Sequence, residues 1–236
     1  MTKLRPWHWA TLAIVASLTL LLLWLVLAYG ELPRLWSKHE HRKVRSGEEI
    51  LSYTAQDIPA DPINLRLIGD RGAVQCAFAR AGWSKADQLS ARSAVVIVRS
   101  VVLQRQYSQA PVSSLYFRDR LQDLAYEREE GRSAHRRHHV RLWQVEPNEW
   151  MGAATYDRGV GLALFTLQVT HHIGADVDAE RDRLGATLVL SGGRYLGATH
   201  SGVAPGRRHR NGGGDPYFTD GLIKTYALPR CSAPSL

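Results

Sequence analysis

The feature that most limits what this chain can fold into is an uncharged apolar run near its amino terminus. No Asp, Glu, Lys or Arg occurs between Pro6 and Gly30, and residues 11–27 are almost wholly Leu, Val, Ile and Ala. A helix rises about 1.5 Å per residue, so about 20 such residues cross a hydrocarbon layer of about 30 Å. We therefore expect residues 1–30 to form an N-terminal transmembrane anchor in contact with membrane lipid.

A cleaved signal peptide is the alternative interpretation of the same run. Lys3 and Arg5 form a positive start, and Ala28-Tyr29-Gly30 fits a cleavage site. The apolar run is longer than the 7 to 15 residues typical of signal peptides, which favours an uncleaved anchor. Aromatic residues near both ends also suit a membrane interface, namely Trp7, Trp9, Trp24, Tyr29 and Trp36.

The basic residues that flank the run bear on its orientation. Two precede it, and five follow it: Arg34, Lys38, Arg42, Lys43 and Arg45. This count slightly favours placing the following domain on the cytoplasmic side, whereas a short basic amino terminus favours the opposite side. The sequence leaves the side open.

Residues 31–61 contain prolines and a basic cluster but no clear core pattern, so we expect a basic juxtamembrane connector there. Lys and Arg beside a span gain about 1 kcal/mol per charge from anionic lipid, although solvated stop-transfer charges look the same. Residues 62–236 are long enough for one globular domain. The division is then anchor 1–30, connector 31–61 and domain 62–236.

The charge balance limits the choice of partner. The chain has 30 Lys and Arg against 22 Asp and Glu, a net charge of +8, which favours phosphates, anionic lipid head groups or acidic membrane proteins. No basic run is interleaved with aromatics, so the sequence does not favour nucleic acid as a partner. Cys76 and Cys231 are too few for a disulfide scaffold, and whether they pair is open.

Alternation of apolar and polar residues predicts a strand at 63–67, and Asp70 is placed to cap a helix that runs to about Ala81. Residues 91–104 fit either a helix or a β-branched strand. Polar turns then separate segments that read as strands at residues 115–117, 123–127, 139–145, 150–157 and 162–173. The first two should form a hairpin, as should the next two.

The last third of the domain predicts one helix followed by strands. Asp176 is placed to cap a helix that ends at Gly192-Gly193, and strands are expected at 194–201 and towards Leu228, with a loop at 202–216 between them. Helices precede and interrupt a series of strands. This order indicates an α+β domain with a largely antiparallel sheet and flanking helices.

Histidines, arginines and carboxylates are concentrated between Ser133 and Leu184, a range that holds five of the ten histidines. Alternation puts His139 and Arg141 on one strand face, and the neighbouring strands of the same meander bring further polar residues alongside. We expect a polar cluster made of His139, Arg141, Asp157, His172 and Asp178. In a regular strand, His171 points away from the side that His172 occupies.

This cluster suits a divalent metal or an anion, since imidazole and carboxylate bind such metals and arginine binds oxyanions. Further candidates for anion binding are Arg120, His138, Arg158 and Arg181. The alternative is that these residues form core contacts and local ion pairs. No His-Glu-x-x-His helix, nucleophile elbow or Walker loop is present.

Several blocks of sequence are distinctive in combination: Ala110-Pro111-Val112-Ser113, 120–125, His138-His139-Val140-Arg141-Leu142-Trp143, 152–157, Thr170-His171-His172-Ile173 and 176–181. On these blocks the chain resembles the LssY C-terminal domain family from about Ile63 to Asp220. The resemblance implies a bacterial protein of the inner (cytoplasmic) membrane and carries no defined activity. Similar domains are joined to polytopic membrane domains of the DedA and phosphatidic-acid-phosphatase-like kinds, and this single-span chain lacks those catalytic domains.

Two classes of function follow. A membrane-anchored accessory or interaction domain is favoured by the anchor, the basic balance and the lack of a complete catalytic motif. The alternative is a His/Asp-dependent hydrolase-like enzyme, with or without a metal, or a domain that binds phosphate or anionic lipid at the membrane surface. The sequence leaves open whether the chain is an enzyme.

Overall fold

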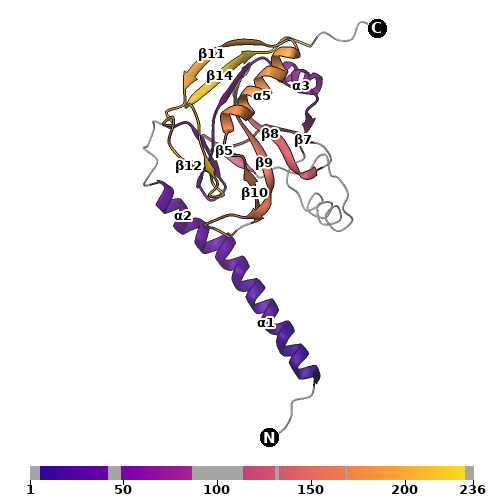
Figure 1. Ribbon diagram of the computed structural model, residues 1–236, viewed down its shortest axis with the longest axis vertical. Coiled ribbons are helices and arrows are strands. Elements are labelled where there is room, and N and C mark those ends of the chain that lie inside the picture. Colours follow the sequence, from indigo (N-terminus) through magenta and orange to yellow (C-terminus); the bar gives the residue numbers. More distant parts are fainter. Residues whose placement is uncertain (1–5, 42–48, 87–113, 131–132, 168, 232–236) are drawn as a thin grey trace, which may run out of the picture.

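The computed structural model describes residues 6–41, 49–86, 114–130, 133–167 and 169–231. One long helix projects from the globular part, whose far end carries the carboxyl terminus (Figure 1). The helix comprises α1 (Pro6–Val26), a π-helical turn (Leu27–Glu31) and α2 (Leu32–His41). Its stretch from Trp7 to Trp36 is apolar and long enough to span a membrane, and its most apolar window is not buried by the rest of the protein.

A large, mostly antiparallel sheet forms the centre of the globular part. Its strands follow the order β11-β14-β3-β9-β8-β7-β4, and β10 also pairs with β9. Only β14 and β3 are parallel among the described pairs of this sheet. The bounds are β3 (Leu65–Ile68), β4 (Ser84–Lys85), β7 (Leu124–Glu130), β8 (Ser133–Glu146), β9 (Glu149–Leu162), β10 (Val169–Ile173), β11 (Arg194–His200) and β14 (Leu222–Ala227).

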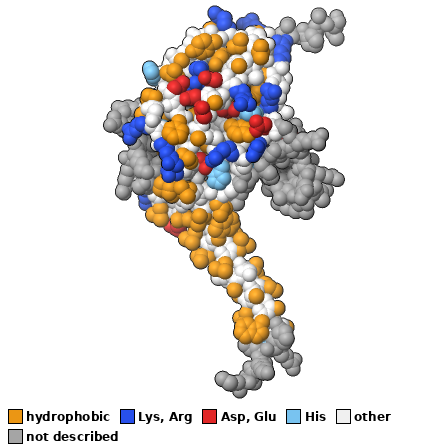
Figure 2. All heavy atoms as spheres, in the orientation of Figure 1, with side chains coloured by type: hydrophobic (Ala, Val, Ile, Leu, Met, Phe, Trp, Pro, Cys, Tyr) orange, Lys and Arg blue, Asp and Glu red, His pale blue; other side chains and the backbone are white. Residues whose placement is uncertain are grey.

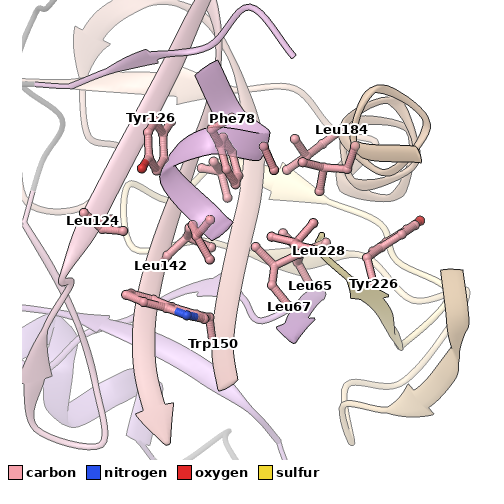
Figure 3. Packing of buried hydrophobic residues seen from close by; sticks show 14 of the residues in the cluster. Leu65, Leu67, Phe78, Leu124, Tyr126, Leu142, Trp150, Leu184, Tyr226 and Leu228 are labelled. Carbon is pink, nitrogen blue, oxygen red and sulfur yellow. The ribbon is translucent and has the colours of Figure 1, made fainter. Parts of the chain in front are cut away.

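Two helices cover one face of this sheet. Asp70 and Asp176 cap them as expected, because each carboxylate accepts a hydrogen bond from a backbone N–H three residues later. These helices are α3 (Arg71–Arg80) and α5 (Val177–Leu190). Their apolar sides pack with Leu65, Leu142 and Trp150 of the sheet into the main core (Figure 3).

A smaller sheet covers the opposite face. Its order is β2-β1-β5-β6, with bounds β1 (Leu51–Thr54), β2 (Pro59–Pro62), β5 (Leu115–Phe117) and β6 (Arg120–Leu121). Phe117 of β5 packs with Trp143 of β8 in a second apolar cluster. The domain is therefore α+β with the large sheet between helices and a second sheet, which confirms the predicted fold class.

Several local predictions were wrong. Strand β5 pairs with β6 around Arg118 and Asp119, whose positive φ angles make a tight turn, so residues 123–127 join the large sheet instead of forming a hairpin with 115–117. The expected strand 162–173 is shorter, because residues 163–167 turn before β10 begins. Inside the expected loop 202–216, β12 (His209–Arg210) pairs with β13 (Pro216–Tyr217).

The range 31–61, where we expected a connector, contains α2, β1 and β2. Leu51, Ile58 and Ala60 are buried in this range, so its residues contribute to the core of the globular part. In the sequence, polar residues separate the apolar residues of this range, so no periodic core pattern is visible there. The prediction for residues 91–104 lies outside the described residues.

Two covalent or stacking contacts join distant parts of the chain. Cys76 of α3 forms a disulfide with Cys231, with their Cα atoms 6.0 Å apart. This resolves the pairing that the sequence left open. At the other end of the domain, the ring of Trp36 in α2 stacks on Phe165 in the turn before β10, with 3.7 Å between ring centroids.

Candidate functional site

Alternation along β8 sends its two adjacent histidines to opposite faces of the large sheet. His138 lies on the face covered by the helices, where its Nδ1 is 2.8 Å from Oε2 of Glu180 in α5. His139 lies on the face towards the smaller sheet, where a polar group of residues replaces the apolar core. The two histidines therefore lie in separate environments, one on each face of the large sheet.

On the second face, Arg137 is the centre of a buried charge network. Its Nη1 donates to Glu127 at 2.8 Å, its Nε donates to Asp157 at 3.2 Å, and its Nη2 lies 3.2 Å from Nε2 of His171. The Arg137 side chain is 3% exposed and its two carboxylate partners 1%. Buried charges persist when they are paired in this way.

His139 and Arg141 extend the network towards the smaller sheet. Nδ1 of His139 is 3.1 Å from Oδ1 of Asp157, and its Nε2 lies 2.9 Å from Nη1 of Arg141 and 2.6 Å from the hydroxyl of Thr155. Because arginine only donates, Nε2 accepts and Nδ1 carries the proton that faces Asp157. Arg141 Nη1 also donates to Asp61 of β2 at 3.0 Å, which ties the two sheets together.

Of the five residues predicted to form a polar cluster, the structure brings three together: His139, Arg141 and Asp157. His172 points away from them, and its Nδ1 is 2.8 Å from Asp215. Its ring occupies the space above Gly161, where an added Cβ would lie 2.3 Å from Nε2. Asp178 lies elsewhere, at the start of α5.

Asp178 and Arg181 belong to a third group, which lies beside the start of β14. The Arg181 guanidinium makes two bonds of 2.8 and 2.9 Å to Asp220, and it also bonds Asp178 and Asp182. The backbone N–H of Asp220 donates to Asp178. This group combines local ion pairs at the start of α5 with bonds to Asp220, and it thereby joins α5 to the segment before β14.

The remaining candidates for anion binding are dispersed. Arg120 donates to the carbonyl of Gln144, and Arg158 donates through Nε to the carbonyl of Ile173. His138 lies on the helix-covered face. These three residues and Arg181 therefore do not form one anion site.

Burial shifts the protonation of the network. It raises the pKa of Glu127 from 4.5 to about 7, against the attraction of Arg137. It lowers the pKa of His171 from 6.5 to about 4, against the opposing effect of Asp157. Burial also favours protonated Asp157, but His139, together with His171 and Arg137, outweighs it and keeps the pKa of Asp157 below its ordinary value.

The pKa shifts of Glu127 and His171 predict how stability changes with pH, and variants of each residue should separate the two effects. Between pH 4.5 and 7 folded Glu127 holds a proton that the unfolded chain has lost, so its contribution to stability falls by about 3 kcal/mol as pH rises. Between pH 4 and 6.5 unfolded His171 holds a proton that the folded state lacks, so its contribution rises by a similar amount. The opposing slopes of these two groups should largely cancel from pH 4.5 to 6.5.

The measurement is urea unfolding as a function of pH. Glu127→Gln should leave a profile that rises with pH, and His171→Gln should leave one that falls. Identical slopes in both variants and in the unmodified chain would exclude these titrations as the cause.

On the helix-covered face, His138 borders a cavity of about 430 Å³. The cavity lies between β7, β8, α5 and the residues that follow α3. Its lining residues are Trp83, Arg128, Glu129, Glu130, His138, Arg183 and Thr187. Sequence reasoning placed His138 among the anion-binding candidates but missed Arg128, Arg183 and the partner Glu180.

A metal site has no direct support in the described parts of the chain. Across residues 6–41, 49–86, 114–130, 133–167 and 169–231, no three His, Cys, Asp or Glu side chains are grouped as metal ligands. In the buried network, arginine occupies the position next to His139 Nε2 that a cation would need. The predicted divalent metal stays a prediction.

Sequence comparison assigns the domain to a family. No curated protein and no solved structure was found to match the chain. A family model described as LssY C-terminus matches residues 45–223, more than half of the chain. The match begins before β1 and ends within β14, so it covers the smaller sheet, α3, α5 and all of the large sheet except most of β14. The chain therefore belongs to the LssY C-terminal domain family.

Proposed function

We propose that this chain is a membrane-anchored accessory domain whose globular part rests on an anionic lipid surface. The observation that carries the proposal is the stack of Trp36 on Phe165 at the end of the apolar helix. It holds the turn between β9 and β10 beside the carboxyl-terminal end of the apolar helix (Figure 1). The turn is thus placed to make a second contact with lipid.

The turn has the composition that an interfacial contact needs. Three exposed leucines lie within a stretch of six residues: Leu162, Leu164 and Leu167 are 49%, 56% and 40% exposed. The transfer of exposed apolar side chains from water into the lipid interface has a favourable free energy. In a turn that faced only water, these exposed leucines would not contribute to stability.

Basic residues near the stack suit anionic head groups. The guanidinium of Arg210 lies 5.6 Å from the centre of the Phe165 ring, and Arg34 and Lys38 are exposed on α2. A cation close to the membrane surface gains about 1 kcal/mol from anionic lipid. We therefore propose anionic lipid, rather than neutral lipid, as the surface that the domain meets.

The disulfide bears on the side of the membrane. Disulfides persist in oxidising compartments and are rare where cytoplasmic reductants act. Since Cys76 and Cys231 are joined, we propose that the globular part lies outside the cytoplasm. This is the opposite of the slight preference from the charge count, and it agrees with a short basic amino terminus that stays inside.

The lipid contact is tested with the full chain in nanodiscs. We expect a fluorophore attached to Leu164→Cys to emit as in an apolar medium and to be quenched by brominated lipid. The native cysteines are joined and do not compete for the label. More quenching is expected in anionic than in neutral discs, and Arg210→Gln should reduce the difference.

Leu190→Cys is the matched control, because Leu190 is an 87% exposed leucine at the far end of α5. Its fluorophore should emit as in water in every disc. Equal emission at positions 164 and 190 would contradict the contact.

A further inference from the structure

We propose that the outer edge of β11 binds an extended, acidic segment of another protein, which adds a strand to the large sheet. β11 is the outermost described strand on its side of that sheet, and it lies at the end of the domain opposite α1 (Figure 1). Figure 2 shows hydrophobic and basic side chains gathered at this end. The surface is therefore separate from the turn that we place on lipid.

The first step is the exposure of the strand. Six of the seven residues of β11 are exposed, and Gly197 is partly buried. Tyr195 and Leu196 are 49% and 45% exposed, and Leu190, which ends α5 shortly before β11, is also exposed. At the other side of the sheet, β4 is only 2 residues long. A long exposed edge with apolar side chains is the part of a sheet that pairs with other chains.

The second step is the direction of the backbone groups. In β14 the N–H of Lys224 donates to a carbonyl just before β3. Backbone groups of successive strand residues point to alternate sides, so those of Ile223 face β11, where Ile223 pairs with Thr199. The backbone groups of Ala198 and His200 therefore point away from the sheet. Within the described part of the chain, no backbone hydrogen bond outside the pairing with β14 uses them.

A bulge in β11 leaves this edge available. The register with β14 shifts between Tyr195 and Gly197, and Gly197 has a φ of 132°. Bulges protect an edge where they interrupt the pairing of backbone groups. The pairing from Gly197 to His200 is regular, so these four residues after the bulge offer an uninterrupted edge.

The third step is the charge around the strand. Arg194 begins β11 and pairs with the last residue of β14, and Arg230 follows β14 three residues later. Both arginines are exposed, and neither forms an ion pair or hydrogen bond with a described residue. The carboxylates beside the start of β14, Asp182 and Asp220, are already bonded to Arg181. The uncommitted charges are thus positive, which favours an acidic partner. A second copy would bring two basic edges together.

Fluorescence anisotropy with the full chain in phosphatidylcholine nanodiscs tests the edge. The probe is a labelled peptide of about nine residues that alternates valine and glutamate, a sequence that favours an extended strand with one acidic face. We expect saturable binding. The same peptide with N-methylated backbone amides should not bind, because it keeps its charges and side chains but has no N–H to donate.

Ala198→Pro tests the strand directly. It should weaken peptide binding about ten-fold or more, because it removes an outward N–H and places a ring beside the added strand. Proline is tolerated on an edge strand where the N–H faces solvent, so the variant should fold. The N-methylated peptide gives an independent result if it does not. Unchanged binding by folded Ala198→Pro, or equal binding of the N-methylated peptide, would overturn the proposal.

The charge of the partner is tested with arginine variants. Arg194→Gln and Arg230→Gln should each weaken binding of the glutamate peptide about two- to five-fold, as expected for exposed ion pairs. Arg118→Gln is the matched control, because Arg118 is exposed in the turn between β5 and β6 and belongs to the smaller sheet's hairpin. A peptide with lysine in place of glutamate should bind more weakly than the original. Equal affinity for both peptides would overturn an acidic partner.

Sedimentation of the full chain in detergent distinguishes a second copy from a different protein. We expect the unmodified chain and Ala198→Pro to have the same oligomeric state. A dimer that Ala198→Pro converts to a monomer would overturn the proposal, because a second copy would then cover β11. Absence of binding of the glutamate peptide at about 100 µM of chain would overturn it as well.

Discussion

Asp157→Ala should lower the free energy of unfolding by about 3–5 kcal/mol, the largest loss that we expect from removing one carboxylate. Asp157 is 1% exposed and lies between Arg137 and His139. Removing it leaves a buried guanidinium with one ion-pair partner fewer and a buried histidine without its carboxylate. Urea unfolding of the variant and the unmodified chain measures the loss.

Asp119→Asn is the matched control. Asp119 is exposed in the turn between β5 and β6, and its positive φ of 61° suits asparagine, so the change should be within about 0.5 kcal/mol. If Asp157 instead served only to bind a ligand, its removal would leave the free energy of unfolding nearly unchanged. Unchanged stability of Asp157→Ala would contradict a structural role for the network.

Removing the disulfide is the second large change. The double variant Cys76→Ser with Cys231→Ser should lose about 2–5 kcal/mol of unfolding free energy. The crosslink closes a loop with a sequence separation of 155 residues, and long loops restrict the unfolded chain most. Thermal unfolding with and without reductant measures the effect.

The reductant supplies the internal control for this prediction. The unmodified chain in reductant should match the double variant, and reductant should not change the double variant further. A thiol reagent should label the full chain from cells only after reduction, if the globular part lies in an oxidising compartment. Free thiols in unreduced chain would contradict both the crosslink and the proposed side.

Local features of the fold were predictable because they depend on neighbouring residues. Asp70 and Asp176 cap helices through bonds that span three residues, and the sequence shows both ends of each bond. Alternation likewise placed His139 with Arg141 and separated His171 from His172. The register of the hairpin of β8 and β9 pairs Asp157 with Arg137, two residues before His139 on the same face of the sheet.

The rest of the site depends on pairings between segments far apart in the chain. Asp61 reaches Arg141 only because β2 belongs to a sheet that covers β8, and residues around Asp61 looked like a connector. Glu180 reaches His138 through the packing of α5 on the sheet. The acidic residues around Glu180 read equally as a helix start, so no local signal marked it as a partner for His138.

The position of β14 sets when the domain can finish folding. This strand lies between β11 and β3, and it pairs with β3 from the opposite end of the domain. The large sheet therefore lacks the link between β3 and its outer strand β11 until nearly the whole domain has left the ribosome, and contacts of such high sequence separation form slowly. Until β14 pairs with both neighbours, the edges of β3 and β11 expose backbone N–H and C=O groups, which are the groups through which sheet edges pair with other chains.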